Sequence, residues 1–222
     1  MLGLPLVRAI AFAVGFVALI GAIIFGAWFF TAKPKIEDPS EAWQKAKTLI
    51  EAHEFDDAVP FVRAAARAGL PEAQAMLGLM YLRGQGVDQD ETEARRWLRI
   101  AAKLGHDPEA STRLARLIET GRGGPADPAE AAQWYALAAR EGHSEAMYRL
   151  AVMHFEGRAP ASSLWEALFW AHQSAQHGLA EAKALVAKTW QAIEERAQHG
   201  DLEAAFWLAR AYAEGIGTSP DA

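Results

Sequence analysis

One pattern occurs three times along this chain of 222 residues, with copies spaced 37 and then 36 residues apart, and this repeat restricts the fold more than any other feature. Each copy carries the same landmarks in the same order. They are Glu72-Ala73, Glu109-Ala110 and Glu145-Ala146; Gly84, Gly121 and Gly157; Ala94, Ala131 and Ala167; Trp97, Trp134 and Trp170; and Gly105, Gly142 and Gly178. A repeated unit of this size buries its apolar side chains only by stacking on its neighbours. The sequence therefore predicts an elongated array of similar units.

Each copy has the pattern of two helices joined by a loop. Small and apolar residues recur at steps of three and four, while glycines fall only between these runs. In every copy the second helix has a start signal, an acceptor side chain three residues before a glutamate, which is the pattern of a capping box. The pairs are Asp90 with Glu93, Asp127 with Glu130, and Ser163 with Glu166. We expect an all-α fold, with about ten helices in antiparallel succession over residues 38–217.

Further units flank the three copies. Residues 38–70 repeat the pattern with a shorter loop, and a new first helix follows from Asp201 toward Gly215. Between Glu181 and His199 there is no glycine, proline or cap, which predicts one long helix in place of a pair. The expected organisation is a tail and anchor at 1–32, a linker at 33–37, a flanking unit at 38–70, three repeats at 71–180, a degenerate and a half repeat at 181–217, and a tail at 218–222.

The repeat resembles the Sel-one-like repeat (SLR) family, a relative of the tetratricopeptide repeat. The resemblance covers roughly residues 71–217 and is carried in the first copy by Glu72-Ala73, Leu77-Gly78, Tyr81, Gly84-Gln85-Gly86-Val87, Asp90, Ala94, Trp97, Ala101-Ala102 and Gly105. Ile118 and His154 replace the tyrosine, and Ala159 replaces Gly86, so the loop of the third copy is expected to differ. Residues 38–70 resemble an ordinary tetratricopeptide unit. The resemblance implies a right-handed α-solenoid whose first helices line a concave surface that contacts other proteins.

Several classes of chemistry lack the residues they need. The chain has no cysteine, and 21 basic residues after Arg8 stand against 28 acidic ones, which argues against nucleic acid as a partner. It contains no phosphate-binding loop, nucleophile elbow or zinc-protease motif. The acidic run Asp88-Gln89-Asp90-Glu91 lacks the glycine and the final glutamate of a calcium loop and is interpreted as a loop and helix cap. We expect no enzyme activity, no cofactor and no metal site.

A candidate partner-binding face follows from the small residues where paired helices meet, Ala46, Gly78, Ala115, Ala151 and Ala209. Residues three before, one after and four after these positions are expected on the concave side, although they could instead pack against the next helix. The candidates are Trp43, Lys47, Ile50, Leu79, Leu82, Arg116, Glu119, Tyr148, Val152, Phe155, Phe206 and Arg210. Trp97, Trp134 and Trp170 are interpreted as core residues. Trp165 is expected either to cover its loop or to be exposed as a partner contact.

Residues 9–30 form an uncharged run of 22 residues, long enough for one transmembrane helix. An uncleaved anchor is favoured over a signal peptide, because Phe30 is bulky where a cleavage site needs a small residue. Flanking charges leave the orientation open. A small-residue face within the run permits close packing with another transmembrane helix, from a partner or a second copy of the chain. Its residues are Ala11, Gly15, Ala18, Ala22 and Gly26.

The expected function is that of a scaffold or adaptor anchored in a bacterial inner membrane, which contacts a protein partner through the concave surface. The family resemblance favours the periplasmic side for the repeats. One alternative is a non-catalytic accessory subunit of a membrane complex that assembles through the transmembrane helix. Another is a binder of envelope polysaccharide or peptidoglycan, or an enzyme that acts on them, for which no paired carboxylates or nucleophile can be named.

Overall fold

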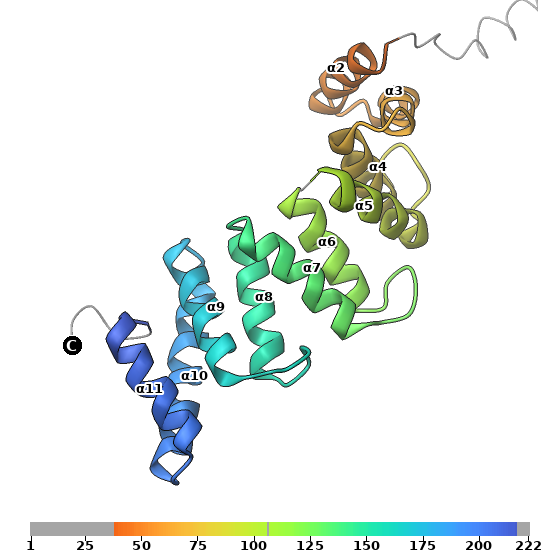
Figure 1. Cartoon of the computed structure of the whole chain (residues 1–222). Helices are drawn as coiled ribbons and strands as arrows, with labels where there is room; N and C mark the ends of the chain where they lie inside the picture. Colours follow the sequence, from red (N-terminus) through yellow and green to blue (C-terminus); the bar gives the residue numbers. More distant parts are fainter. Residues whose placement is uncertain (1–37, 106, 217–222) are drawn as a thin grey trace, which may run out of the picture. The chain divides into compact units, whose positions relative to one another are not determined.

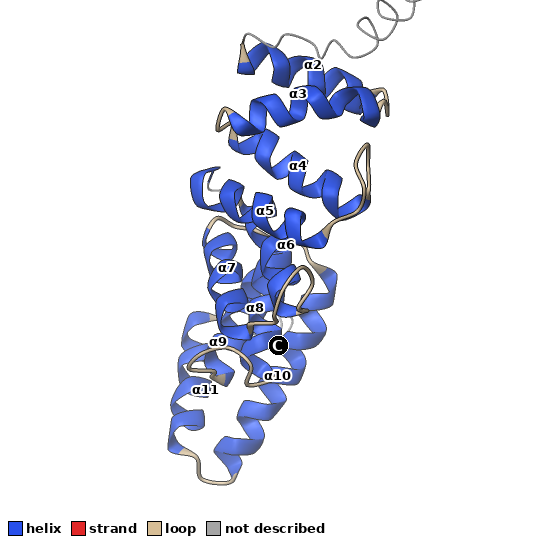
Figure 2. Ribbon diagram, turned by 90° about the vertical axis from the view of Figure 1, so that its right-hand side faces the viewer, coloured by secondary structure: helices blue, strands red, loops and turns tan. Residues whose placement is uncertain are grey.

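The computed structural model describes residues 38–105 and 107–216, which form ten helices and no strands (Figures 1 and 2). This confirms the predicted all-helical fold. The helices are α2 (Pro39–Glu51), α3 (Phe55–Arg67), α4 (Pro71–Arg83), α5 (Glu91–Gly105), α6 (Pro108–Glu119), α7 (Pro128–Arg140), α8 (Ser144–Phe155), α9 (Leu164–Gln176), α10 (Ala180–Gln198) and α11 (Leu202–Glu214).

The helices form a solenoid in which each helix packs against the next one in sequence. Helix α10 also contacts α8. Figure 1 shows α2 at one end of this row and α11 at the other. As the lack of glycine and proline predicted, α10 is a single helix of 19 residues where the earlier units have a pair. The repeats therefore stack mainly through successive helices, as expected of a repeat architecture.

Small residues allow the paired helices to approach closely. Ala46, Ala115 and Ala151 are fully buried, and Gly78 lies so close to the second helix that a Cβ added there would be 2.8 Å from Leu98 Cγ. Ala209 holds the corresponding position in α11 but is exposed. No second helix follows α11 among the described residues, so the meeting point of paired helices expected at Ala209 stays a prediction.

The second helices begin at the predicted caps. Asp90 Oδ1, Asp127 Oδ1 and Ser163 Oγ accept hydrogen bonds of 3.0, 2.9 and 3.1 Å from the backbone N–H groups of the glutamates three residues later. The return bond of the capping box is replaced by other partners. The N–H of Asp90 donates to Tyr81 O at 3.0 Å, and that of Asp127 donates to Ile118 O at 3.1 Å. These bonds attach the start of α5 to the end of α4 and the start of α7 to the end of α6.

The glutamate carboxylates bind tryptophan side chains instead. Indole Nε1 groups of Trp97, Trp134 and Trp170 donate to Glu93, Glu130 and Glu166 at 3.1, 3.1 and 3.0 Å. Trp207 does the same to Glu203 in α11, at 3.2 Å. The three repeated tryptophans are half-buried, with their polar edge satisfied by the preceding turn of their own helix. They therefore form the outer margin of the core rather than its centre.

The predicted membrane segment cannot be compared with this structure. Residues 9–30, with Ala11, Gly15, Ala18, Ala22 and Gly26, lie outside the described residues. Among the residues that the structure describes, no helix is both long enough and apolar enough to cross a bilayer.

Candidate interaction surface

The twelve residues predicted to bind a partner are here called the first-helix surface. None of the twelve is fully buried. Three are exposed, namely Arg116, Phe206 and Arg210. Nine are half-buried, namely Trp43, Lys47, Ile50, Leu79, Leu82, Glu119, Tyr148, Val152 and Phe155. The small residues beside them in the same helices are buried, Ala209 excepted, so the helices present these larger side chains at the edge of the core.

In α8, Tyr148, Val152 and Phe155 pack their inner sides against a buried cluster that includes Leu185 of α10. The Lys188 ammonium group lies 4.8 Å from the centre of the Phe155 ring, within the range of a cation–π interaction. These aromatic and aliphatic side chains therefore contact the next first helix and remain partly open to solvent. The packing between helices that the sequence allowed is therefore present on the inner sides of these side chains, and their role in binding a partner stays a prediction.

At the first two units the surface is more aliphatic. Trp43, Lys47 and Ile50 of α2 and Leu79 and Leu82 of α4 are all half-buried. Leu82 packs against the main core cluster, which is built around residues such as Leu98 and Leu114. This end of the surface is thus mixed, with apolar side chains and the basic Lys47.

Glu119 of α6 has both carboxylate oxygens occupied. Tyr135 Oη donates a hydrogen bond of 2.9 Å to Glu119 Oε2, and Arg158 Nη1 donates to Glu119 Oε1 at 2.7 Å. Burial raises the pKa of Tyr135, and the charge of Glu119 acts in the same direction. The phenol therefore stays protonated and donates throughout the physiological range. Glu119 joins the second helix of its own unit to the loop of the next unit.

The two candidates in α11 differ from each other. The Arg210 guanidinium lies 4.7 Å from the Trp165 ring and 5.6 Å from the Trp207 ring, and its Nε donates to Glu214 at 2.6 Å. Arg210 is therefore held over two stacked indoles. Phe206 is 60% exposed and contacts Trp207 edge-on, with ring centroids 4.9 Å apart.

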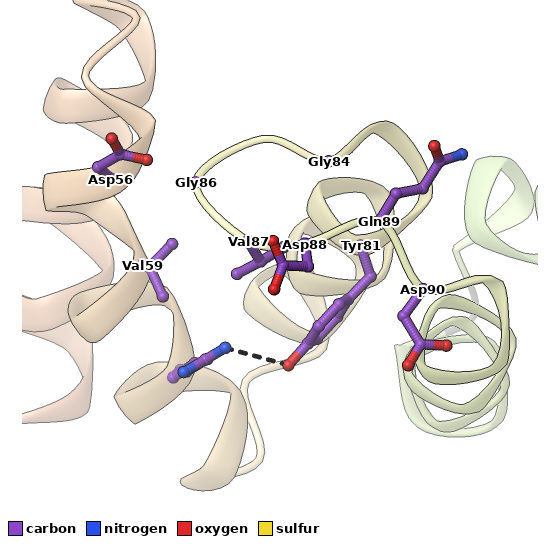
Figure 3. Close-up of a pocket in the computed structure, with 10 residues that line it drawn as sticks. Asp56, Val59, Tyr81, Gly84, Gly86, Val87, Asp88, Gln89 and Asp90 are labelled. Carbon is purple, nitrogen blue, oxygen red and sulfur yellow. Dashed lines mark hydrogen bonds between the residues drawn. The ribbon is translucent and has the colours of Figure 1, made fainter.

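A polar cleft of about 600 Å³ lies between α3 and the loop from α4 to α5 (Figure 3). Its wall carries the carboxylates of Asp56, Asp88 and Asp90, and Arg63 Nη2 donates to Tyr81 Oη at 3.1 Å across it. Asp90 also caps α5 through the N–H groups of Thr92 and Glu93, at 2.9 and 3.0 Å. The sequence interpretation of this acidic run as a loop and cap is therefore confirmed for Asp90.

Sequence reasoning missed the cleft because its two sides come from different units. The sequence signal that could have indicated the cleft is the acidic first turn of α3, Asp56-Asp57. In stacked units this turn lies beside the loop between the two helices of the next unit. Within the described residues, no three histidine, aspartate or glutamate side chains gather in a way that could hold a metal ion.

The stacked helix pairs with inserted loops define an α-solenoid of the tetratricopeptide type. The model of the Sel1 repeat, the same repeat as the SLR above, matches residues 71–106, 108–143, 144–179 and 202–222. The chain belongs to the Sel1 repeat family. The unit at 38–70 and helix α10 fall outside the matched segments.

Solved structures show the same fold. A Sel1 repeat protein from Oxalobacter formigenes is 29% identical, with a TM-score of 0.61 over 84% of this chain and 83% of that one. The protein c5321, a protective antigen of uropathogenic Escherichia coli strains that displays an SLR fold, is 26% identical, with a TM-score of 0.58. That match covers 83% of this chain and 46% of c5321, so the chain spans less than half of that protein. A comparison with curated proteins found no match.

Proposed function

We propose that this protein is a scaffold that binds a protein partner along the first-helix surface. The observation that carries the proposal is the contrast between neighbouring positions of the first helices. Ala46, Gly78, Ala115 and Ala151 are small and buried in α2, α4, α6 and α8, whereas the first-helix surface beside them changes in size, charge and aromatic character from unit to unit. Packing alone explains the constant positions, and recognition of one particular partner explains the varied ones.

The aromatic side chains of this surface are its strongest anchors. Trp43, Tyr148 and Phe206 share one repeat position, at which α4 and α6 carry the buried residues Ala75 and Thr112. An aromatic ring at this position cannot be covered completely and keeps an edge in solvent. Partly exposed aromatic side chains on a rigid framework are typical anchors of protein interfaces, and truncation of such an anchor often costs about 2 kcal/mol of binding free energy.

We also propose that residues 9–30 anchor the scaffold in a bacterial inner membrane, with the repeats in the periplasm. The support is the uncharged run of 22 residues and the family resemblance. Retention of the chain in the membrane pellet after an alkaline wash, with residues 1–32 still present by N-terminal sequencing, is the expected result. A mature chain that starts at Lys33 would show that the segment is a signal peptide. A protease accessibility assay on intact spheroplasts tests the side.

The partner-binding proposal is tested by placing a photo-crosslinking amino acid at position 148 in native membranes. Position 104 is the matched control, because Leu104 is an apolar residue on a second helix and is 60% exposed. We expect a discrete adduct from position 148 and none from position 104. Tyr148→Ala should then weaken capture of the identified protein while the melting temperature stays nearly unchanged. A loss of roughly 3 to 5 kcal/mol in folding stability would assign Tyr148 to the core instead.

A further inference from the structure

A cleft of about 410 Å³ lies between α5 and the loop that joins α6 to α7. Its wall on α5 carries four cationic side chains, Arg95, Arg96, Arg99 and Lys103, and the loop contributes Gly123, Gly124 and Pro125. We call it the basic cleft. Arg96 is neutralised by Glu93 of its own helix, with Nη2 and Oε2 2.7 Å apart. The other three cations are a local concentration of positive charge in a chain whose net charge is −6.

These three cations have a single carboxylate between them. Glu130 Oε1 accepts from Arg99 Nη2 at 2.8 Å, and Glu130 Oε2 lies 3.8 Å from Arg95 Nη2. Lys103 is exposed and forms no ion pair with any residue that the structure describes. The basic cleft therefore holds two positive charges that no carboxylate of the described chain matches.

Arg95 is buried in the wall of the basic cleft, with 8% of the residue exposed. Its Nη1 donates to Pro125 O at 2.9 Å, but its Nη2 makes no hydrogen bond within the described part of the chain. A buried guanidinium with free donors is costly, because its charge has left water without a full set of acceptors. An acceptor that enters the cleft from outside would complete this set.

Packing of the repeat does not require an arginine at this position. The corresponding residues are Val59 in α3 and Ala132 in α7, and both are buried as Arg95 is. The corresponding cleft on α7 has one cation, Arg140, at the position of Lys103. The cleft beside α3 carries three aspartates (Figure 3). The concentration of cations is thus particular to the basic cleft and is not a property of the fold.

We propose that the basic cleft binds an extended segment of another protein in which two glutamate or aspartate residues are separated by one residue. Arg95, Arg99 and Lys103 follow one another at steps of four along α5, so their backbone positions are about 6 Å apart. Alternate side chains of an extended chain lie on one face about 6.7 Å apart. The spacing of two such carboxylates therefore matches the spacing of the cations.

The chemistry of the basic cleft favours carboxylates over phosphate. Its arginines already hold the carboxylate of Glu130, and a planar guanidinium matches a carboxylate through two parallel hydrogen bonds. Ile100 also lines the cleft and gives the methylene groups of a glutamate an apolar wall, which inorganic phosphate cannot use. This inference goes beyond the proposed function, because the cleft is on a second helix and its ligand is separate from the partner of the first-helix surface. Leu104, the control position used above, does not line the cleft.

The first test measures binding of a fluorescent peptide, Glu-Gly-Glu-Gly-Glu, to the full chain in non-ionic detergent micelles at low salt by anisotropy. We expect saturable binding with a Kd of about 1 mM or tighter, and no binding of the same peptide with glutamine in place of glutamate. Lys103→Glu should weaken binding at least about tenfold, because it replaces a cation of the cleft with an anion. Arg140→Glu, the same charge change at the corresponding position of α7, should change the Kd by less than about twofold. Equal binding of the two peptides, or wild-type affinity in Lys103→Glu, would overturn the proposal.

The second test changes binding in the opposite direction. Glu130→Gln releases Arg95 and Arg99 from their internal carboxylate, while the amide oxygen can still accept from Trp134 as the carboxylate does. The glutamate peptide should then bind at least about threefold more tightly, and an unchanged or weaker affinity would overturn the assignment of these arginines. Competition by inorganic phosphate and glycerol phosphate tests the chemical class of the ligand. If either displaced the labelled peptide at a lower concentration than unlabelled glutamate peptide does, the cleft would be a site for phosphate, free or on a lipid headgroup, and the proposal would be wrong.

Discussion

The indole rings of Trp165 and Trp207 stack with their centroids 4.9 Å apart and their planes 16° from parallel. Trp165 lies in the first turn of α9, and Trp207 lies in the middle of α11, so the stack joins two helices that are separated in sequence by the whole of α10. Arg210 covers the pair from α11. As a result Trp165 is 7% exposed, and the expectation that it could be an exposed partner contact is wrong.

Removal of this stack should loosen the C-terminal end of the solenoid. For Trp165→Ala we expect a loss of about 3 kcal/mol in the stability of α10 and α11, because removal of a buried indole leaves a cavity between α9 and α11. Hydrogen exchange of the α10 and α11 amides measures this local stability. Leu104→Ala, at an exposed apolar site, should change it by less than about 0.5 kcal/mol. Equal protection in the two variants would contradict the assigned role of the stack.

The loop of the first full repeat depends on a close contact at Gly86. Its φ is +67°, and a Cβ added there would lie 2.5 Å from Phe55 O. Gly157, in the third repeat, has a φ of +73° but no atom within 4 Å of an added Cβ. Gly157→Ala should cost about 1 kcal/mol from backbone strain alone. Gly86→Ala should cost about 3 kcal/mol, because the loop must also move away from α3. Thermal unfolding of the two variants measures the difference, and equal losses would show that the Phe55 contact is unimportant.

Acid should destabilise the protein in two separate pH ranges. Burial lowers the pKa of His154 below 6.5, an effect that Glu166 partly offsets, so the unfolded chain binds a proton at this residue more readily than the folded chain does. Stability should therefore fall as the pH drops below 6.5 toward the folded pKa. His154→Ile, which installs the residue found at Ile118, should reduce this loss between pH 7 and 5.5. It should not abolish the loss, because burial also lowers the pKa of His172.

The second pH range in which acid lowers the stability lies below the first and is set by a carboxylate. The hydrogen bond from Arg96 holds the pKa of Glu93 below its usual 4.5, so the stability that this group contributes is present above pH 4.5 and is lost as the pH falls through the folded value. Melting temperatures of the wild type and His154→Ile across pH 4 to 8 separate the two ranges. An unchanged slope between pH 7 and 5.5 in the variant would remove His154 from the explanation.

Helix ends could be predicted from the sequence because the interactions that set them span only a few residues. Asp90, Asp127 and Ser163 cap helices as predicted, and Gly142 ends α7 in a left-handed conformation with φ of +87°. The different loop of the third repeat was also expected from Ala159, and in that loop a non-glycine residue, Ala161, is left-handed, with φ of +49°. Each of these outcomes depends on side-chain and backbone preferences within one turn.

Contacts between units could not be predicted in the same way. The repeat register predicts that Ala209 occupies the same position as Gly78. The register does not predict whether a second helix covers that position. The capping-box pattern predicts that each of these glutamate carboxylates accepts a hydrogen bond from a backbone N–H group. The indole four residues later binds the same carboxylate instead, as Trp134 does at Glu130. The stack of Trp165 on Trp207 depends on the path of α10 between them, which no local pattern encodes.

Variants of two α6 residues best distinguish a role in partner binding from a role in packing on the first-helix surface. Arg116 is exposed, and its nearest acidic group, Glu145, is 4.0 Å away, so Arg116→Ala should leave stability within about 0.5 kcal/mol and weaken partner capture. Glu119 accepts hydrogen bonds from Tyr135 and Arg158, so Glu119→Gln should lower stability by about 1.5 kcal/mol and change capture little. Urea unfolding and a capture assay on both variants measure the two effects. If Glu119→Gln weakened capture without loss of stability, Glu119 would belong to the binding surface after all.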